Sequence, residues 1–214
     1  PQWISTVNFN LRKPNFIIIH HTAQDSLQQT VKTFTLTRTQ VSAHYVISDD
    51  GTVVQMLNDY LRAWHGGNAS WGKNTDINSA SIGIELDNNG SEPFSETQIN
   101  SLLALLSRLK KEYNIPTQNI IAHSDIAPTR KSDPSAFFPW KNLAELGFGL
   151  WPEANLEKAP ENFNIEQGLR IIGYDTRNLS SAIKAFKLHY IQTEVDDVLD
   201  EKTINTIYSI YKKQ

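Results

Sequence analysis

Three residues at the ends of two apolar segments have side chains that bind metal ions. His20 follows the run FIII, His123 follows NIIA, and Asp133 comes ten residues after His123. Two imidazoles and one carboxylate leave the fourth position of a tetrahedral metal open for water, which is the pattern of catalytic zinc. Such a site lowers the pKa of the water from about 15.7 towards 7. The spacing indicates metal-assisted hydrolysis; the alternative is a pair of strand-end histidines with ordinary hydrogen bonds.

Two further charged residues fit the same chemistry. In SIGIEL, apolar residues alternate with Ser81, Gly83 and Glu85, which share the opposite face. A carboxylate on a central strand is costly to bury, so it is expected to have a functional role. Beside a metal-activated water, it is the natural general base. The alternative is a lone glutamate on the solvated face of an edge strand. Lys131 is either an ordinary surface lysine or the positive charge that stabilises an oxyanion.

The other histidines near these motifs have weaker patterns. His44 opens a hairpin, and Trp64 and His65 lie in AWHGG. Glycines allow a ligand to approach the backbone, so this loop is predicted to line the substrate site, and His44 is predicted to bind substrate with Trp64 and His65. His21 is expected to point away from His20 and to support the metal ligands from outside.

The elements that position these residues alternate between strands and helices. Short buried strands are predicted at NFIIIHHT and NIIAH, a hairpin at AHYVISDDGTVVQML about its Asp-Asp-Gly turn, and an alternating strand at SIGIEL. The segment DSLQQTVKTF is predicted to be a helix capped by Asp25 or Ser26. This order favours an α/β domain with a mixed central sheet flanked by helices.

The most regular helix is predicted in FSETQINSLLALLSRLKKEYNIP. Ser95 and Gln98 form a capping box, and Pro116 closes the segment. Its apolar stripe consists of Ile99, Leu102, Leu103, Leu106 and Tyr113.

A boundary is predicted near residues 151–162, where Pro, Asn and charged residues replace the periodic apolar pattern. The remaining segment is short for an independent core but long enough for a small helical bundle. Two helices are expected there, one capped by Ser180 or Ser181 and one by Asp200. His189 is predicted to be a packing residue of the first of them.

Composition narrows the classes of protein. The chain has 214 residues, a net charge of −3 and no cysteine, and its Lys and Arg residues form no cluster that would bind nucleic acid. Any metal must be held by His, Asp or Glu. No apolar run approaches the roughly 20 residues that cross a bilayer. The chain begins at Pro1, which leaves room for an upstream leader or lipid anchor.

Five motifs occur together in the order seen in one family. FIIIHHTA, SAHYVISDDGTVVQML, AWHGG, SIGIEL and AHSDIAPTRKSDPSAFFPW resemble those of zinc-dependent N-acetylmuramoyl-L-alanine amidases, the family shared by phage amidases and peptidoglycan recognition proteins. The resemblance covers about residues 10–152. It is closest to the branch that uses aspartate as the third metal ligand.

The resemblance implies a role for each matching residue. The zinc ligands would be His20, His123 and Asp133, which selects His20 over His21. The catalytic carboxylate would be Glu85 and the transition-state lysine Lys131. Some members carry a catalytic tyrosine immediately before the hairpin histidine, where this chain has Ala43, so that role must fall to another residue, which we expect to be Glu85.

The C-terminal segment resembles the small three-helix peptidoglycan-binding domain of wall hydrolases, through LRIIGYD, AIKAFKLHY and LDEKTINTIYSIYKK. A generic helical appendage is the alternative. The expected organisation is a zinc amidase domain at 1–152, a linker at 153–162 and a peptidoglycan-binding-like helical domain at 163–214. The partners expected are peptidoglycan or muropeptides. A monomer in the periplasm or cell envelope, associated with the outer membrane, is favoured over a cytoplasmic protein.

The expected reaction is cleavage of the amide between the lactyl group of (anhydro-)N-acetylmuramic acid and L-alanine, in cell-wall turnover or recycling. A recognition module that binds muropeptides without cutting them is less favoured, because such relatives usually lack a ligand or the catalytic pair. A zinc peptidase of the stem peptide is a second alternative, although no HExxH motif is present. A cytosolic recycling amidase is a third, and a wall-binding tail argues against it.

Overall fold

The computed structural model describes residue 8 and residues 11–24 and 26–214. Its centre is a five-stranded sheet with the strand order β3-β2-β4-β1-β5. Strand β2 pairs with β3 in antiparallel fashion, whereas β1 is parallel to both β4 and β5, and β2 is parallel to β4. The strands are β1 (Phe16–His21), β2 (Tyr45–Ile47), β3 (Val53–Gln55), β4 (Ser81–Leu86) and β5 (Ile120–Ala122). The predicted mixed sheet is confirmed.

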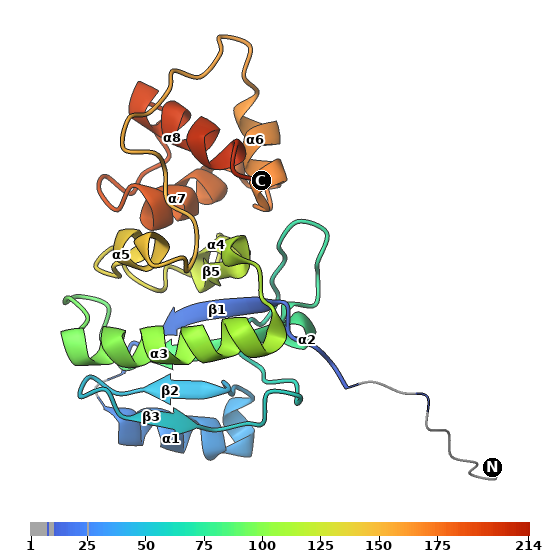
Figure 1. The fold of residues 1–214 in the computed structure, drawn as a ribbon, viewed down its shortest axis with the longest axis vertical. Helices are drawn as coiled ribbons and strands as arrows, with labels where there is room; N and C mark the ends of the chain where they lie inside the picture. The colour runs from blue at the N-terminus through green and yellow to red at the C-terminus, as the bar shows by residue number, and fades with distance from the viewer. Residues whose placement is uncertain (1–7, 9–10, 25) are drawn as a thin grey trace.

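Strand β1 is an interior strand, between β4 and β5, and is buried on both faces. Ile17 and Ile19 belong to one hydrophobic cluster, and Phe16 and Ile18 to another on the opposite face. A run of consecutive β-branched residues is suited to such a strand, because each side chain meets a packed layer. The helix α3 (Glu96–Tyr113) covers the first face, where it lies across the sheet in Figure 1.

The N-terminus of α3 differs in one detail from the predicted capping box. The Ser95 hydroxyl accepts a hydrogen bond from the Gln98 N–H at 3.1 Å, as expected. The Gln98 side chain does not reach back to Ser95. It is buried, and its amide donates to the carbonyls of Ile47 and Asp87 at the ends of two strands. A buried amide needs acceptors, and these carbonyls supply them, so only half of the predicted box forms.

Shorter helices surround the sheet. Ser26 caps the helix that follows β1, and the alternative cap, Asp25, lies outside the described residues. These elements are α1 (Leu27–Thr35), η1 (Thr37–Thr39), α2 (Ile77–Ala80), η2 (Thr117–Asn119), α4 (His123–Ile126) and α5 (Trp140–Glu145).

Three C-terminal helices lie at one end of the molecule, beyond the β5 edge of the sheet (Figure 1). They are α6 (Ile165–Ile172), α7 (Leu179–Tyr190) and α8 (Glu201–Tyr211). Asp200 caps α8 as predicted. The predicted cap of α7 is wrong: Asn178, rather than Ser180 or Ser181, accepts the hydrogen bond, from the N–H of Ser181. An asparagine is as good a cap as a serine, so the helix begins earlier.

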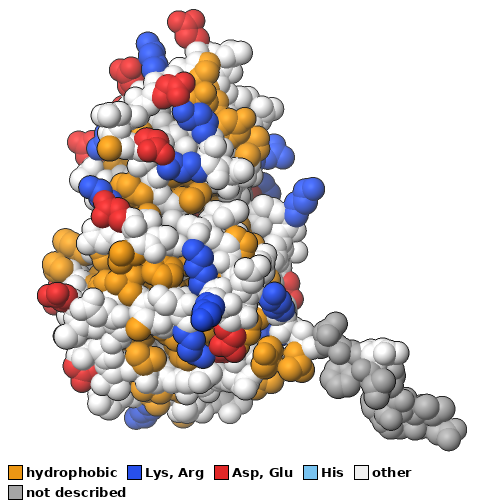
Figure 2. All heavy atoms as spheres, in the orientation of Figure 1, with side chains coloured by type: hydrophobic (Ala, Val, Ile, Leu, Met, Phe, Trp, Pro, Cys, Tyr) orange, Lys and Arg blue, Asp and Glu red, His pale blue; other side chains and the backbone are white. Residues whose placement is uncertain are grey.

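The C-terminal helices share their hydrophobic core with the sheet. Leu169, Phe186 and Ile207 belong to the same buried cluster as Phe16 and Ile18 of β1. The division at 153–162 therefore remains a prediction. On the face shown in Figure 2, acidic side chains lie among basic ones. Among the described residues, no helix is both long enough and apolar enough to span a bilayer.

Candidate active site

The site lies at the carboxyl ends of β1, β4 and β5. His20 and Glu85 are register partners on the parallel strands β1 and β4, so their side chains share one face of the sheet. His123 follows β5 directly and begins α4. Because β1 and β5 are parallel neighbours, both histidines reach the same edge, which is where ligands collect in open α/β sheets.

The three predicted metal ligands converge. His20 Nδ1 lies 2.9 Å from His123 Nδ1 and 3.3 Å from Asp133 Oδ2, and His123 Nδ1 lies 3.1 Å from Asp133 Oδ2. All three residues are buried and form a group that can hold a metal ion. Bonds of about 2.0–2.1 Å in tetrahedral geometry separate ligand atoms by about 3.3 Å. The spacing of the three atoms is close to that value.

Neighbouring groups determine where the protons of the His20 ring lie. The Ser81 hydroxyl donates to the carbonyl of Ile77 at 2.6 Å and therefore accepts from His65 Nε2 at 3.1 Å. His65 Nδ1 then carries a lone pair and accepts from His20 Nε2 at 3.0 Å. Burial lowers the pKa of His20 to about 4 and that of His65 well below its ordinary value, so both rings are neutral at pH 7. His20 Nδ1 consequently presents a lone pair.

The His123 ring has the same orientation for a different reason. His123 Nε2 lies 3.4 Å from the carbonyl oxygen of Gly66, which can only accept a hydrogen bond. With the ring N–H on Nε2, directed at this carbonyl, Nδ1 faces His20 and Asp133 with a lone pair. Three electron-pair donors that point at one another without a proton between them repel unless a cation lies among them. The residues therefore fit a bound metal.

His65 and Ser81 act behind the ligands, and the sequence did not reveal this. His65, which is predicted to line the substrate site, lines the cavity beside the ligands, and its ring also holds the tautomer of His20. It fits across β4 only because position 83 is glycine, where an added Cβ would lie 2.4 Å from the His65 ring. The alternation of small residues in SIGIEL was the available signal, and it marks the space for this ring.

Glu85 lies beside the ligands at the edge of a cavity. Its side chain is 12% exposed, and its Oε1 is 3.8 Å from His20 Nδ1. Burial, together with the charge of Asp133, raises the pKa of Glu85 to about 8, and the charge of Lys131 acts in the opposite direction. A cation on the three donors would also lower this pKa. A carboxyl group poised near neutral pH can both take and return a proton.

The cavity over the site has a volume of about 400 Å³. Its lining includes the three ligands together with His21, Trp64, His65, Glu85 and Lys131. Trp64 is 51% exposed and forms part of the rim. The ring of His21 accepts a hydrogen bond from the N–H of Ser135, two residues after Asp133, and its supporting role stays a prediction. The structure thus brings together all the predicted site residues except His44.

His44 lies behind the cavity rather than in its wall. It is fully buried, its Nδ1 accepts from the N–H of Gly83, and its ring meets that of His65 with 5.9 Å between centroids. His44 immediately precedes β2, and its backbone N–H donates to the carbonyl of Gly83 in β4 at 3.0 Å. A direct contact with substrate is therefore not supported for this residue.

The buried His44 ring predicts acid sensitivity. Burial lowers its pKa to about 4, below the value of about 6.5 expected in the unfolded chain. The unfolded state therefore binds a proton first as pH falls, and stability present above about pH 6.5 is lost towards pH 4, by up to about 3 kcal/mol. Urea unfolding of the metal-free proteins measures this. We expect the difference in free energy of unfolding between the wild type and His44→Gln to become smaller as the pH falls through this range.

If the difference between the two proteins is independent of pH, the assignment of this loss to His44 is wrong. NMR titration of the His44 ring in the metal-free wild type gives the same test without a variant. A midpoint near 6.5 in the folded protein would contradict the prediction.

A buried carboxylate links the metal site to the C-terminal helices. Asp125, two residues after His123, accepts hydrogen bonds from the Tyr174 hydroxyl at 2.5 Å, from His189 Nδ1 at 2.6 Å and from the Ala122 N–H at 2.8 Å. His189 is buried and stacks on Tyr190, with ring centroids 3.9 Å apart, as befits the predicted packing residue. Tyr174, just after α6, and His189 of α7 thus anchor the element that carries His123.

We expect Asp125→Asn to lower the free energy of unfolding by about 3 kcal/mol, because it leaves buried donors facing an amide N–H₂ group. Urea unfolding measures the change. Asp175→Asn, which breaks the Asp175–Arg177 ion pair of an 88%-exposed arginine, is the matched control and should cost no more than about 1 kcal/mol. Equal losses in the two variants would show that the Asp125 contacts add no special stability.

The sequence matches a known family and several of its characterised members. A family model described as N-acetylmuramoyl-L-alanine amidase matches residues 10–136. The chain is 33% identical to the N-acetylmuramoyl-L-alanine amidase AmiD of Escherichia coli (strain K12), over 87% of this chain and 78% of that protein. It is 38% identical to the 1,6-anhydro-N-acetylmuramyl-L-alanine amidase AmpD of Haemophilus influenzae, over 48% of this chain and 56% of that protein.

Two solved structures are similar over nearly the whole chain. The complex of E. coli AmiD with anhydro-N-acetylmuramic acid-L-Ala-D-gamma-Glu-L-Lys has a TM-score of 0.84 at 29% identity, covering 98% of this chain and 93% of that one. AMPDH3 from Pseudomonas aeruginosa with anhydromuramic pentapeptide has a TM-score of 0.85 at 28% identity, covering 99% and 96%. Both similarities extend through the C-terminal helices.

Proposed function

We propose that this chain, which belongs to the N-acetylmuramoyl-L-alanine amidase family, hydrolyses one amide bond of peptidoglycan. The bond joins the lactyl group of N-acetylmuramic acid, intact or in anhydro form, to L-alanine of the stem peptide. One observation carries the proposal: three buried electron-pair donors converge beside a buried carboxyl group at the wall of an open cavity. The substrate complexes of AmiD and AMPDH3 support the choice of muropeptides.

We also propose that this site binds zinc. Two imidazole nitrogens and one carboxylate oxygen suit zinc, and three protein ligands are typical of its catalytic sites. His20, His123 and Asp133 would hold it. When bound, zinc supplies Lewis-acid chemistry, because it acidifies water and polarises a carbonyl group.

Glu85 moves the proton in the proposed mechanism. Its carboxylate takes a proton from the attacking water as the new C–O bond forms at the lactyl carbonyl carbon. The resulting tetrahedral species carries negative charge, and the ammonium group of Lys131 at the cavity wall stabilises it. Glu85 then returns the proton to the amide nitrogen as the C–N bond breaks. The products are a lactyl carboxylate and a peptide with a free amino terminus.

The cavity wall provides the contacts that orient the substrate. Trp64 presents an exposed indole at the rim, and an aromatic face suits packing against a sugar ring or a peptide. His65 is the second wall residue of the AWHGG loop.

Product analysis tests the proposed reaction. Purified enzyme is incubated with anhydro-N-acetylmuramic acid-L-Ala-D-gamma-Glu-L-Lys, with and without chelator, and the products are identified by mass spectrometry. We expect free tripeptide with L-alanine at its amino terminus, lost with chelator and restored by zinc. Cleavage within the tripeptide would indicate a peptidase. Binding of the intact compound without cleavage would indicate a recognition module.

We further propose that the protein acts in the cell envelope. The resemblance of helices α6–α8 to a wall-binding domain supports this location. Cell fractionation with an antibody tests it, and recovery of the full-length natural protein in the cytosol alone would contradict it.

A further inference from the structure

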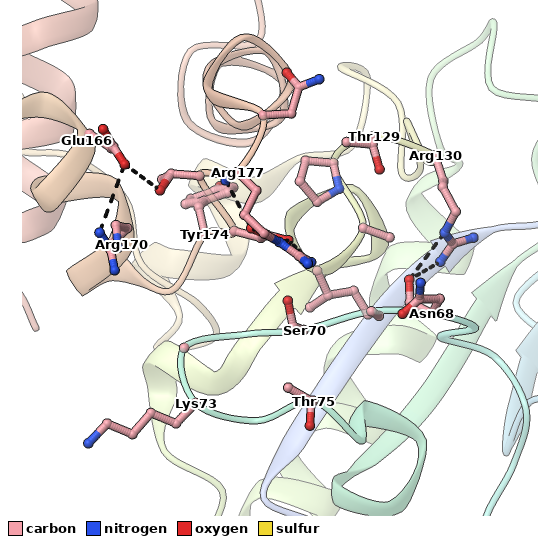
Figure 3. Close-up of a pocket in the computed structure, with 18 of the residues that line it drawn as sticks. Asn68, Ser70, Lys73, Thr75, Thr129, Arg130, Glu166, Arg170, Tyr174 and Arg177 are labelled. Atoms are coloured by element: carbon pink, nitrogen blue, oxygen red, sulfur yellow. Dashed lines mark hydrogen bonds and ion pairs between the residues drawn. The ribbon is translucent and has the colours of Figure 1, made fainter.

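A second hollow, larger than the active-site cavity, lies between the sheet domain and the C-terminal helices. Its volume is about 1250 Å³, roughly three times the 400 Å³ of the cavity over the metal ligands. Its walls are the loop 68–75, the segment 126–130 and residues 166–178 of α6 and the turn that follows it (Figure 3). We refer to this hollow as the groove.

Arg130 joins the groove to the active site, because it lines both cavities. Its guanidinium donates to the carbonyls of Gly66 at 2.9 Å and Asn68 at 2.8 Å. The Gly66 carbonyl is also the group that His123 Nε2 faces. Arg130 and the Gly66 carbonyl thus connect the wall of the groove to the metal ligand His123.

The floor of the groove is held in place. The N–H of Gly72 in the loop donates to the carbonyl of Gly173 at 2.8 Å, which links the loop to the end of α6. Trp71 packs so tightly under Gly173 that an added Cβ there would lie 2.3 Å from its ring, and it also contacts Tyr174. A hollow built on such contacts is preformed, as ligand sites usually are.

The charge of the groove is positive although the chain is negative. Lys73, Arg130, Arg170 and Arg177 line it against two carboxylates, an excess of two positive charges, whereas the whole chain carries −3. Each carboxylate already has an arginine partner, in the pairs Arg177–Asp175 and Arg170–Glu166. Lys73 has no ion-pair partner among the described residues. Figure 3 shows its side chain extending from the loop.

The groove also presents apolar surface. Ile171 of α6 is 55% exposed there, and Ala127 and Pro128 lie in the same lining. Cationic groups beside small apolar surfaces suit a peptide that carries carboxylates and short aliphatic side chains. The tripeptide bound by AmiD has this chemistry, since it contains L-Ala and a γ-linked glutamate whose α-carboxylate is free.

We propose that the groove binds the stem peptide of a neighbouring disaccharide unit of the same peptidoglycan polymer while another unit occupies the active site. This inference rests on the proposed function for its choice of polymer. The proposal accounts for two features of the groove: it shares Arg130 with the wall of the active-site cavity, and its volume is larger than that of this cavity. The groove serves polymeric substrate only, and a single muropeptide has no need of it.

Charge reversal in the groove tests the proposal. Lys73→Glu with Arg177→Glu is compared with Lys111→Glu with Lys141→Glu, which changes the net charge equally on exposed lysines outside the groove. Both doubles are made in the Glu85→Gln background, to prevent cleavage, and thermal unfolding confirms that both fold. Co-sedimentation with purified sacculi should be about tenfold weaker or more for the groove variant alone, and this difference should diminish at high salt.

The same doubles with Glu85 intact measure turnover of the single muropeptide. We expect its kcat/KM to stay within about twofold for both. Equal binding of the two double variants to sacculi would overturn the proposal. It would also be overturned if the groove variant lost turnover of the single muropeptide as strongly as it lost sacculus binding, because the groove would then be part of the primary site. Undiminished binding of the Glu85→Gln protein to glycan strands stripped of peptide would overturn the assignment to a peptide. Failure of the wild type to cleave the monomer refutes the proposed function and leaves the sedimentation result intact.

Discussion

Glu85→Gln is expected to reduce kcat on anhydro-N-acetylmuramic acid-L-Ala-D-gamma-Glu-L-Lys by about 10³-fold, within the range that general acid–base groups contribute. Glutamine keeps the size of the side chain but neither accepts the proton of water nor returns one to the leaving nitrogen. The residue is 3.8 Å from His20 Nδ1, so it is close to the reacting atoms without belonging to the three ligands. Steady-state kinetics with metal-saturated enzyme measure the loss.

Metal content separates this effect from damage to the site. The variant should bind zinc with an affinity like that of the wild type. Glu112→Gln, which removes an exposed carboxylate on α3 paired with Arg108, should leave turnover unchanged. If Glu85→Gln retains full turnover with metal bound, Glu85 is not the general base.

Asp133→Ala is expected to weaken zinc binding by more than about 100-fold and to abolish turnover, since loss even of a group behind a ligand costs 10–100-fold. The substitution removes the only charged ligand and leaves two imidazole lone pairs 2.9 Å apart. Competition with a chromophoric chelator measures the affinity. Full turnover by Asp133→Ala with one zinc per chain would remove Asp133 from the ligand set.

A companion variant tests the tautomer argument. His65→Gln keeps all three ligands but changes the partner of His20 Nε2. We expect its zinc affinity to fall by about 10–100-fold, less than for Asp133→Ala. An unchanged affinity would show that His65 does not position His20.

Much of the site could be predicted because it depends on local patterns. Strand β1 and strand β5 are apolar runs that end in histidine, and parallel strands bring their carboxyl ends to one edge. The alternation in SIGIEL placed Glu85 on the face of β4 that carries small residues, and the register shows that this face lies on the side of His20. Periodicity and one rule of sheet topology were enough for these inferences, whereas the choice of His20 over His21 and the roles of Asp133 and Lys131 rested on the family resemblance.

The remaining features depend on contacts that no local pattern specifies. His65 reaches His20 from a loop 45 positions away, and Gly83 matters only because that ring crosses it. Asp125 is an ordinary acidic residue in the sequence, and only the approach of Tyr174 and His189 makes it a buried anchor. For the same reason the shared core of the sheet and helices α6–α8 did not appear in the sequence.

The central claim is that water attacks the lactyl carbonyl carbon at the site of His20, His123, Asp133 and Glu85. Its most direct test is hydrolysis of the anhydromuramyl tripeptide in water enriched in ¹⁸O, followed by mass spectrometry of both products. We predict one ¹⁸O atom in the new carboxylate of the sugar product and none in the tripeptide. Label in a carboxyl group of a peptide fragment, or recovery of the intact compound, would contradict the assignment of this site to an N-acetylmuramoyl-L-alanine amidase.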